Sequence, residues 1–168
     1  MKKPFLLFAA LFSLALICST SSVKAQGAEY TTAVGLRLGS PISASGKYFF
    51  AENLAAEANI GFRGYSTYSW VTLSAAIQKY APLEIEGIEG LQWYFGGGIG
   101  LYFWNFDFVS EFNTTTFGVQ GYLGLDYTFQ GTPISITADW IPTIFLGDGF
   151  TTGFGAGFGA LGVRYILN

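Results

Sequence analysis

The stretch from Thr115 to Phe129 reads TTFGVQGYLGLDYTF, and its residues alternate in character along the whole length. Every second residue from Phe117 to Phe129 is apolar or aromatic except Gly121, whereas the residues between them are Thr, Gly, Gln, Tyr and Asp. A period of two places successive side chains on opposite faces of a β-strand. The stretch therefore predicts a long strand with one apolar face and one polar face.

The same period recurs along most of the chain and is interrupted by short clusters of Gly, Pro, Asn, Ser and acidic residues. Eight extended segments are predicted: 30–38, 43–50, 55–63, 70–80, 91–104, 115–129, 134–146 and 154–167. Short connections favour antiparallel hairpins between consecutive strands. Because these segments and their connections use up nearly the whole sequence, no room remains for a second domain.

The first 25 residues have the composition of a targeting segment. Two lysines precede the apolar run from Phe5 to Ile17, which is shorter than the roughly 20 residues that a spanning helix needs. Val23 and Ala25 supply the small side chains that a signal peptidase prefers, so cleavage is expected after Ala25. We expect a cleavable signal peptide at 1–25 and an outer-membrane β-barrel domain at 26–168.

The charged residues indicate which face of each strand meets lipid. They make up 11% of the chain, against about 25% in soluble domains. Eight lie within predicted strands, and seven of them occupy the polar face: Arg37, Lys47, Glu57, Arg63, Asp126, Asp139 and Arg164. The eighth, Lys79, lies near a strand end, where its long side chain can reach the membrane interface. A soluble sandwich or lipocalin also alternates, but the apolar face carries too many aromatic rings to fill one narrow lumen. We therefore predict an all-β, eight-stranded antiparallel up-and-down transmembrane β-barrel with the charges of the polar face inside.

The last predicted strand carries the most specific motif. Residues 162–167 read GVRYIL and look like the carboxy-terminal signal read by the barrel-assembly machinery, with Gly162, Tyr165 and Leu167 at its spacing. The chain thus resembles the small eight-stranded outer-membrane barrels, the group of OmpX and the OmpA transmembrane domain. This resemblance implies a bacterial outer-membrane location, with outer-membrane lipid and the assembly machinery as partners. We expect both termini in the periplasm.

Little in the sequence points to catalysis or cofactor binding. The chain has no histidine, the usual general base beside a serine nucleophile. Glycines 157, 159 and 162 have dinucleotide-binding spacing, but the chain ends six residues later, before any helix could follow. Without residues 1–25 the chain keeps five of its eight basic residues and all 11 acidic ones. The resulting net charge near −6 excludes a nucleic-acid role. We expect no cofactor and no metal.

The interior charges favour a structural role over a conduction path. Lys47, Glu57, Asp126 and Arg164 are expected toward the periplasmic half, and the other three toward the outer half. Opposed charges in a narrow lumen should pair and seal it. The leading hypothesis is a non-enzymatic barrel with a structural or surface-interaction role, in which the aromatic loop from Trp104 to Phe112 could bind a surface ligand. A narrow porin-like channel is the alternative, and a lipid-modifying enzyme comes third.

Overall fold

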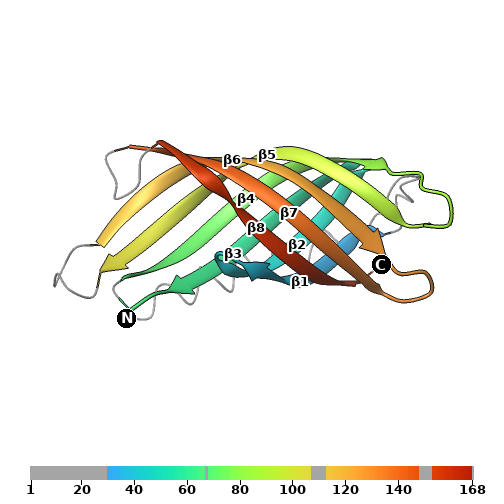
Figure 1. Cartoon of the computed structure of the whole chain (residues 1–168), viewed down its shortest axis with the longest axis horizontal. Helices are drawn as coiled ribbons and strands as arrows, with labels where there is room; N and C mark the ends of the chain where they lie inside the picture. Colours follow the sequence, from blue (N-terminus) through green and yellow to red (C-terminus); the bar gives the residue numbers. More distant parts are fainter. Residues whose placement is uncertain (1–29, 67, 107–112, 148–152, 168) are drawn as a thin grey trace.

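The computed structural model describes residues 30–66, 68–106, 113–147 and 153–167. Eight antiparallel strands close into one barrel in chain order, with β8 hydrogen-bonded to β1 (Figure 1). The strands are β1 (Thr32–Gly39), β2 (Ile42–Ala51), β3 (Leu54–Gly64), β4 (Tyr68–Pro82), β5 (Leu91–Phe106), β6 (Asn113–Thr128), β7 (Ile134–Leu146) and β8 (Gly153–Ile166). The predicted eight-stranded barrel is confirmed. The expected signal peptide lies outside the described residues.

Each strand separates an inner from an outer face, as the period of two predicts. On β6, Val119 and Leu123 are 43% and 46% exposed, whereas Gln120 and Asp126 are 6% and 2% exposed. Among the described strand residues, Lys79 is the one charged side chain on the outer face, and it lies near the end of β4. The outer wall of the barrel is therefore apolar along most of its height, and the polar side chains are inside.

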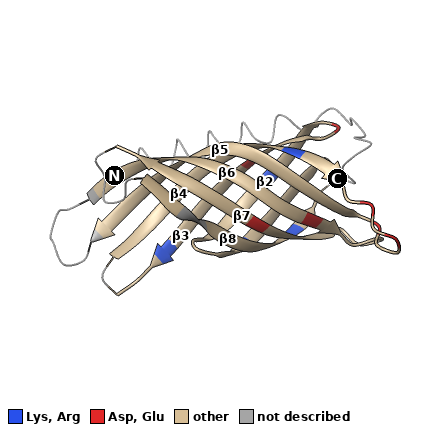
Figure 2. Ribbon diagram, turned by 45° about the horizontal axis from the view of Figure 1, so that its top comes forward, with Lys and Arg blue, Asp and Glu red and all other residues tan. Residues whose placement is uncertain are grey.

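The two ends of the barrel differ in their connections. The start of β1 and the end of β8 share one end with the β2–β3, β4–β5 and β6–β7 connections, and we call it the terminal end. The opposite end, here the distal end, carries the other four connections. The β4–β5 connection at the terminal end bears exposed Glu84, Glu86 and Glu89. Figure 2 shows these acidic positions near the C-terminus and the few charges along the strands.

The pairing of strands is irregular on β2, between Phe49 and Ala51, and on β7. The pairing of β7 with β8 shifts register between Ile141 and Thr143, on either side of Pro142. Proline has no backbone N–H to donate to a ladder, so it is tolerated in a strand where a bulge interrupts the pairing. The alternation predicts β7 from 134 to 146, which matches its bounds, but it does not predict the bulge.

Candidate functional site: the filled lumen

Glu57 lies at the centre of a buried charge cluster inside the barrel. Its carboxylate accepts a hydrogen bond from Arg164 Nη2 at 2.9 Å, and it pairs with Lys47 Nζ at 3.2 Å and Arg37 Nη1 at 3.4 Å. Lys47 faces Glu57 directly across the β2–β3 ladder, where opposite charges interact best. One carboxylate is thus shared by three cations from three other strands.

Two further carboxylates complete this cluster. Asp139 on β7 accepts a hydrogen bond from Arg37, and Asp126 on β6 pairs with Arg164 Nη1 at 3.5 Å. The six side chains are nearly inaccessible, since their relative exposures run from 1% to 8%. Three positive and three negative groups therefore balance, which is the arrangement in which ionised groups tolerate removal from water.

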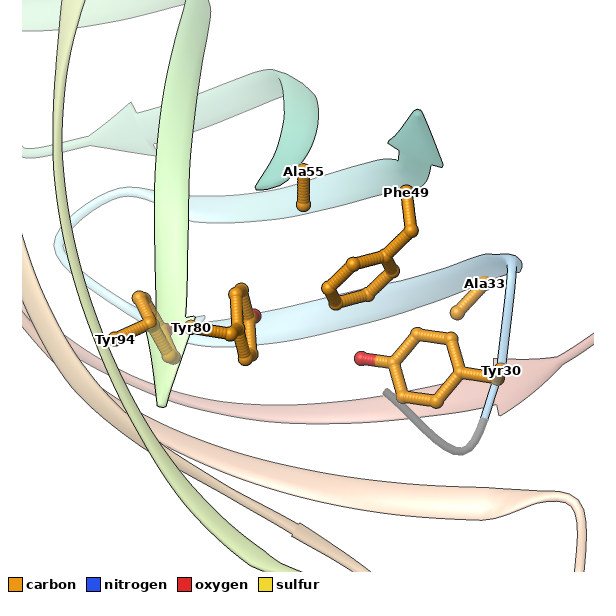
Figure 3. Packing of buried hydrophobic residues seen from close by; sticks show 6 residues of the cluster. All are labelled: Tyr30, Ala33, Phe49, Ala55, Tyr80 and Tyr94. Carbon is orange, nitrogen blue, oxygen red and sulfur yellow. The ribbon is translucent and has the colours of Figure 1, made fainter. Parts of the chain in front are cut away.

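Aromatic rings cover the charge cluster toward the terminal end. Tyr30, Phe49 and Tyr80 lie side by side across the lumen, with ring centroids 5.2 Å and 4.8 Å apart, and Tyr80 stacks on Tyr94 (Figure 3). Lys47 Nζ lies 4.8 Å from the centroid of Tyr80 and 4.6 Å from that of Tyr94, within cation–π range. The rings thus contact both one another and the buried ammonium group.

Tyr30 joins the aromatic layer to the charges. It precedes β1, and its hydroxyl donates a 2.8 Å hydrogen bond to Asp126 Oδ2. Burial raises the pKa of Tyr30 well above its usual value, and the nearby Asp126 carboxylate raises it further. The phenol therefore stays protonated and remains a donor to Asp126.

A second aromatic cluster fills the lumen toward the distal end. It contains Trp70, Tyr102, Trp104 and Phe145, with Tyr68 and Phe158 packed against it. The Trp70 and Trp104 centroids are 4.9 Å apart, and Trp104 Nε1 donates to Thr116 Oγ1 at 3.1 Å. Trp104 is thus an inward-facing residue of β5, which corrects its assignment to a surface-binding loop. Residues 107–112 of that loop lie outside the described residues.

A small cavity of about 40 Å³ lies between the charge cluster and the distal aromatic rings. Arg37 and Asn59 line it, and their Nε and Nδ2 atoms are buried without a hydrogen-bond partner. Gln120 also lines it and accepts a 3.1 Å hydrogen bond from Tyr122. A polar space of this size can hold ordered water, which would supply the missing acceptors.

The seven predicted interior charges are not all brought together. Six form the cluster around Glu57, and their two expected layers meet because Arg37 reaches Glu57 as well as Asp139. Arg63 does not join them. It lies next to the distal end of β3, is half-buried, and its guanidinium sits 4.9 Å from the Tyr65 ring centroid. The alternation predicts the face of Arg63, but near the distal end of β3 its side chain contacts Tyr65 and not the charge cluster.

The residues of the expected assembly signal lie on the two faces of β8. Tyr165 and Leu167 are 56% and 51% exposed on the outer wall. Gly162 faces inward, where an added Cβ would overlap Thr137 Oγ1. A side chain at Gly162 would thus displace the neighbouring β7 side chain.

The described part of the chain contains no group of three or more His, Cys, Asp or Glu side chains that could hold a metal ion. Within the same residues, no helix is long and apolar enough to cross a membrane. The acidic residues Asp107, Glu111 and Asp148, which fall in the predicted connections, lie outside the described residues.

Two solved structures have a similar architecture. The barrel superposes on the N-terminal β-barrel domain of Pseudomonas aeruginosa OprF with a TM-score of 0.59, at 16% identity over 80% of this chain and 93% of that one. It superposes on Neisserial surface protein A with a TM-score of 0.58, at 14% identity over 81% and 93%. The chain has the fold of the small outer-membrane barrels. No family model and no curated protein sequence matches this chain significantly.

Sequence reasoning missed the interior aromatic rings of this outer-membrane-barrel fold. Phe49 is two residues beyond Lys47, and Trp104 is two beyond Tyr102, so both share the inward face of their strands. The alternation itself was the signal. The lumen accommodates large rings opposite glycines such as Gly124, where an added Cβ would lie 2.5 Å from the Tyr94 ring.

Proposed function

We propose that this protein is a non-enzymatic integral barrel of the bacterial outer membrane whose lumen is closed to solutes. The proposal rests mainly on the balanced cluster around Glu57, which lies between two layers of packed aromatic rings. Ions crossing the lumen would have to displace buried, paired charges and close-packed rings. A structural or surface-interaction role in the envelope is the function that such a filled barrel supports best.

The apolar outer wall supports the membrane location. Large side chains such as Leu36, Phe62 and Trp140 are 61%, 59% and 50% exposed on it. Such side chains are favourable in contact with lipid hydrocarbon. A basic residue at mid-membrane depth would instead cost about 2 to 4 kcal/mol. An even number of strands puts both termini at one end of the barrel, and we assign that end to the periplasm.

Single-channel recording tests the closed lumen. Purified wild-type barrel in planar bilayers should give no steady conductance, because the charge cluster and the rings leave no continuous water path. The Glu57→Gln variant provides the comparison, and Glu52→Gln in the exposed β2–β3 turn is the matched control. Steady wild-type openings whose ion selectivity changes in Glu57→Gln would defeat the proposal.

A narrow channel is the second candidate, and the cavity beside Arg37 favours it. If that cavity of about 40 Å³ extended to both mouths, the buried unpartnered groups of Arg37 and Asn59 would line a water-filled path. The recordings above separate the two functions. A lipid-modifying activity would instead appear as turnover of lipid by the purified barrel.

A further inference from the structure

The outer wall carries a hollow that the hydrogen-bonded register explains. One lateral row of outward-facing residues runs across five strands: Trp93, Leu125, Ala138, Leu161 and Leu38. In the adjacent row, Leu123 pairs with Trp140, and Trp140 with Gly159. Ala138 and Gly159 are thus small residues on neighbouring strands, surrounded by leucine and tryptophan. They form the floor of a hollow of about 620 Å³.

We propose that this hollow is a binding site for one acyl chain of a membrane phospholipid. The inference rests on the membrane location proposed above. The outward-facing residues that line the hollow carry no charge, and Asp139, which also lines it, directs its carboxylate to Arg37 inside the lumen. The hollow therefore offers no ionised group to a headgroup or a charged peptide. Its volume is within the range of pockets that hold drug-sized ligands, which a flexible acyl chain can match.

Packing explains why the hollow should hold a chain more firmly than the rest of the wall. In hydrocarbon, association depends on van der Waals contact, because the bilayer is as apolar as the protein surface. A chain lying over Ala138 and Gly159 contacts the floor and the flanking Trp140, Leu125 and Leu161 at once, whereas a chain on a convex surface contacts one side only. The hollow is also continuous with the lipid-facing wall, so the bilayer supplies its occupant.

Tryptophan fluorescence can report on the hollow directly. The chain has four tryptophans, of which Trp70 and Trp104 are buried in the lumen and Trp93 and Trp140 line the hollow. In a W70F/W104F variant, quenching by brominated phosphatidylcholine therefore reads the hollow alone. Should this variant not fold, the difference between wild type and W93F/W140F gives the same signal.

The first arm tests the membrane location itself. In bilayers made wholly of brominated phosphatidylcholine, Trp93 and Trp140 should be quenched whether or not the hollow binds a chain. Absence of quenching there would refute the lipid-facing wall, and with it the proposed function.

The second arm tests the hollow. In detergent micelles, stepwise addition of brominated phosphatidylcholine should quench wild type saturably at about one lipid per barrel, and Ala138→Leu or Gly159→Leu should raise the half-saturating ratio about tenfold by filling the floor. An added Cβ at Gly159 lies 3.7 Å from the Asp139 carbonyl oxygen, an ordinary contact, so Gly159→Leu fits. The matched control is Ala75→Leu, an outward-facing substitution on β4 away from the hollow.

Two results would overturn the acyl-chain site while leaving the membrane location intact. One is unsaturable quenching that Ala138→Leu and Ala75→Leu affect equally. The other is a dimer in light scattering that Ala138→Leu dissociates, because the occupant would then be a second copy of the chain.

Discussion

At the scale of single residues, Glu57 has the most demanding environment in the barrel. It is 2% exposed and lies within 3.4 Å of nitrogen atoms from Arg37, Lys47 and Arg164. Transfer of one carboxylate out of water costs several kcal/mol, and only close partners offset that cost. The three cations face the same penalty, and Glu57 is the carboxylate that all three share, although Arg37 also pairs with Asp139 and Arg164 with Asp126.

Removal of this carboxylate should destabilise the barrel strongly. We expect Glu57→Gln to lower the free energy of unfolding by about 3 to 5 kcal/mol, because it leaves buried cations without their shared partner. Lys47→Met in the same chain should restore part of the loss, since charge balance returns. Urea titration of barrels in lipid vesicles, followed by tryptophan fluorescence, measures both.

The control for this prediction is Glu52→Gln. Glu52 is exposed in the β2–β3 turn, so its loss should change the unfolding free energy by about 0.5 kcal/mol at most. Equal effects of Glu57→Gln and Glu52→Gln would show that the cluster contributes nothing specific.

At the scale of the strands, alternation predicted the number, order and faces of the elements but not their ends. Strand β5 was predicted to end at Trp104 and extends to Phe106, because pairing with Tyr68 at the start of β4 continues past the last alternating residue. The alternation of apolar and polar residues reflects which face of the strand lies outside or inside the barrel. The hydrogen-bonded ladder between strands needs only a partner strand and can continue beyond the alternating stretch. The same limit explains Arg63, since the period gives its face but not its distance from Glu57.

Glycines of β2 and β5 should respond oppositely to an added methyl group. A Cβ at Gly96 would overlap the Ile77 carbonyl oxygen of β4, so Gly96→Ala should cost about 1 to 3 kcal/mol. Gly46 has no atom within 4 Å of an added Cβ, so Gly46→Ala should be neutral or stabilise by about 0.5 kcal/mol through lower chain entropy. Urea midpoints of the two variants measure the contrast. Equal midpoints would contradict the close approach of β4 and β5.

The last strand should matter for assembly as well as for stability. Tyr165→Asn with Leu167→Asn should lower the fraction of folded barrel in cell membranes several-fold, because these positions carry the proposed assembly signal. Val163→Asn is the matched control, since Val163 is also outward-facing on β8 and 55% exposed. Protease resistance in membranes and refolding yield in detergent separate the two effects. An equal loss for both variants in cells would remove the signal from these residues.

At the scale of the whole molecule, the barrel reverses the arrangement of a soluble protein. Within the described strands most charged side chains lie inside, in a cluster of three positive and three negative groups, while leucine, isoleucine and phenylalanine cover the outside. The low charge content and the parity of the charged residues predicted this inversion from sequence. The alternation also gives the inward face of rings such as Trp104, but not the space that glycines such as Gly124 leave for the rings inside the lumen.

A nitroxide scan along β6 tests this inversion most directly. Single cysteines from Val119 to Leu125, spin-labelled in lipid bilayers, should show accessibility to oxygen with a period of two. We predict high oxygen accessibility at Val119, Leu123 and Leu125, and low accessibility at Gln120 and Tyr122. Accessibility that is uniform along β6, or highest at Gln120 and Tyr122, would contradict the assignment of the apolar face to lipid.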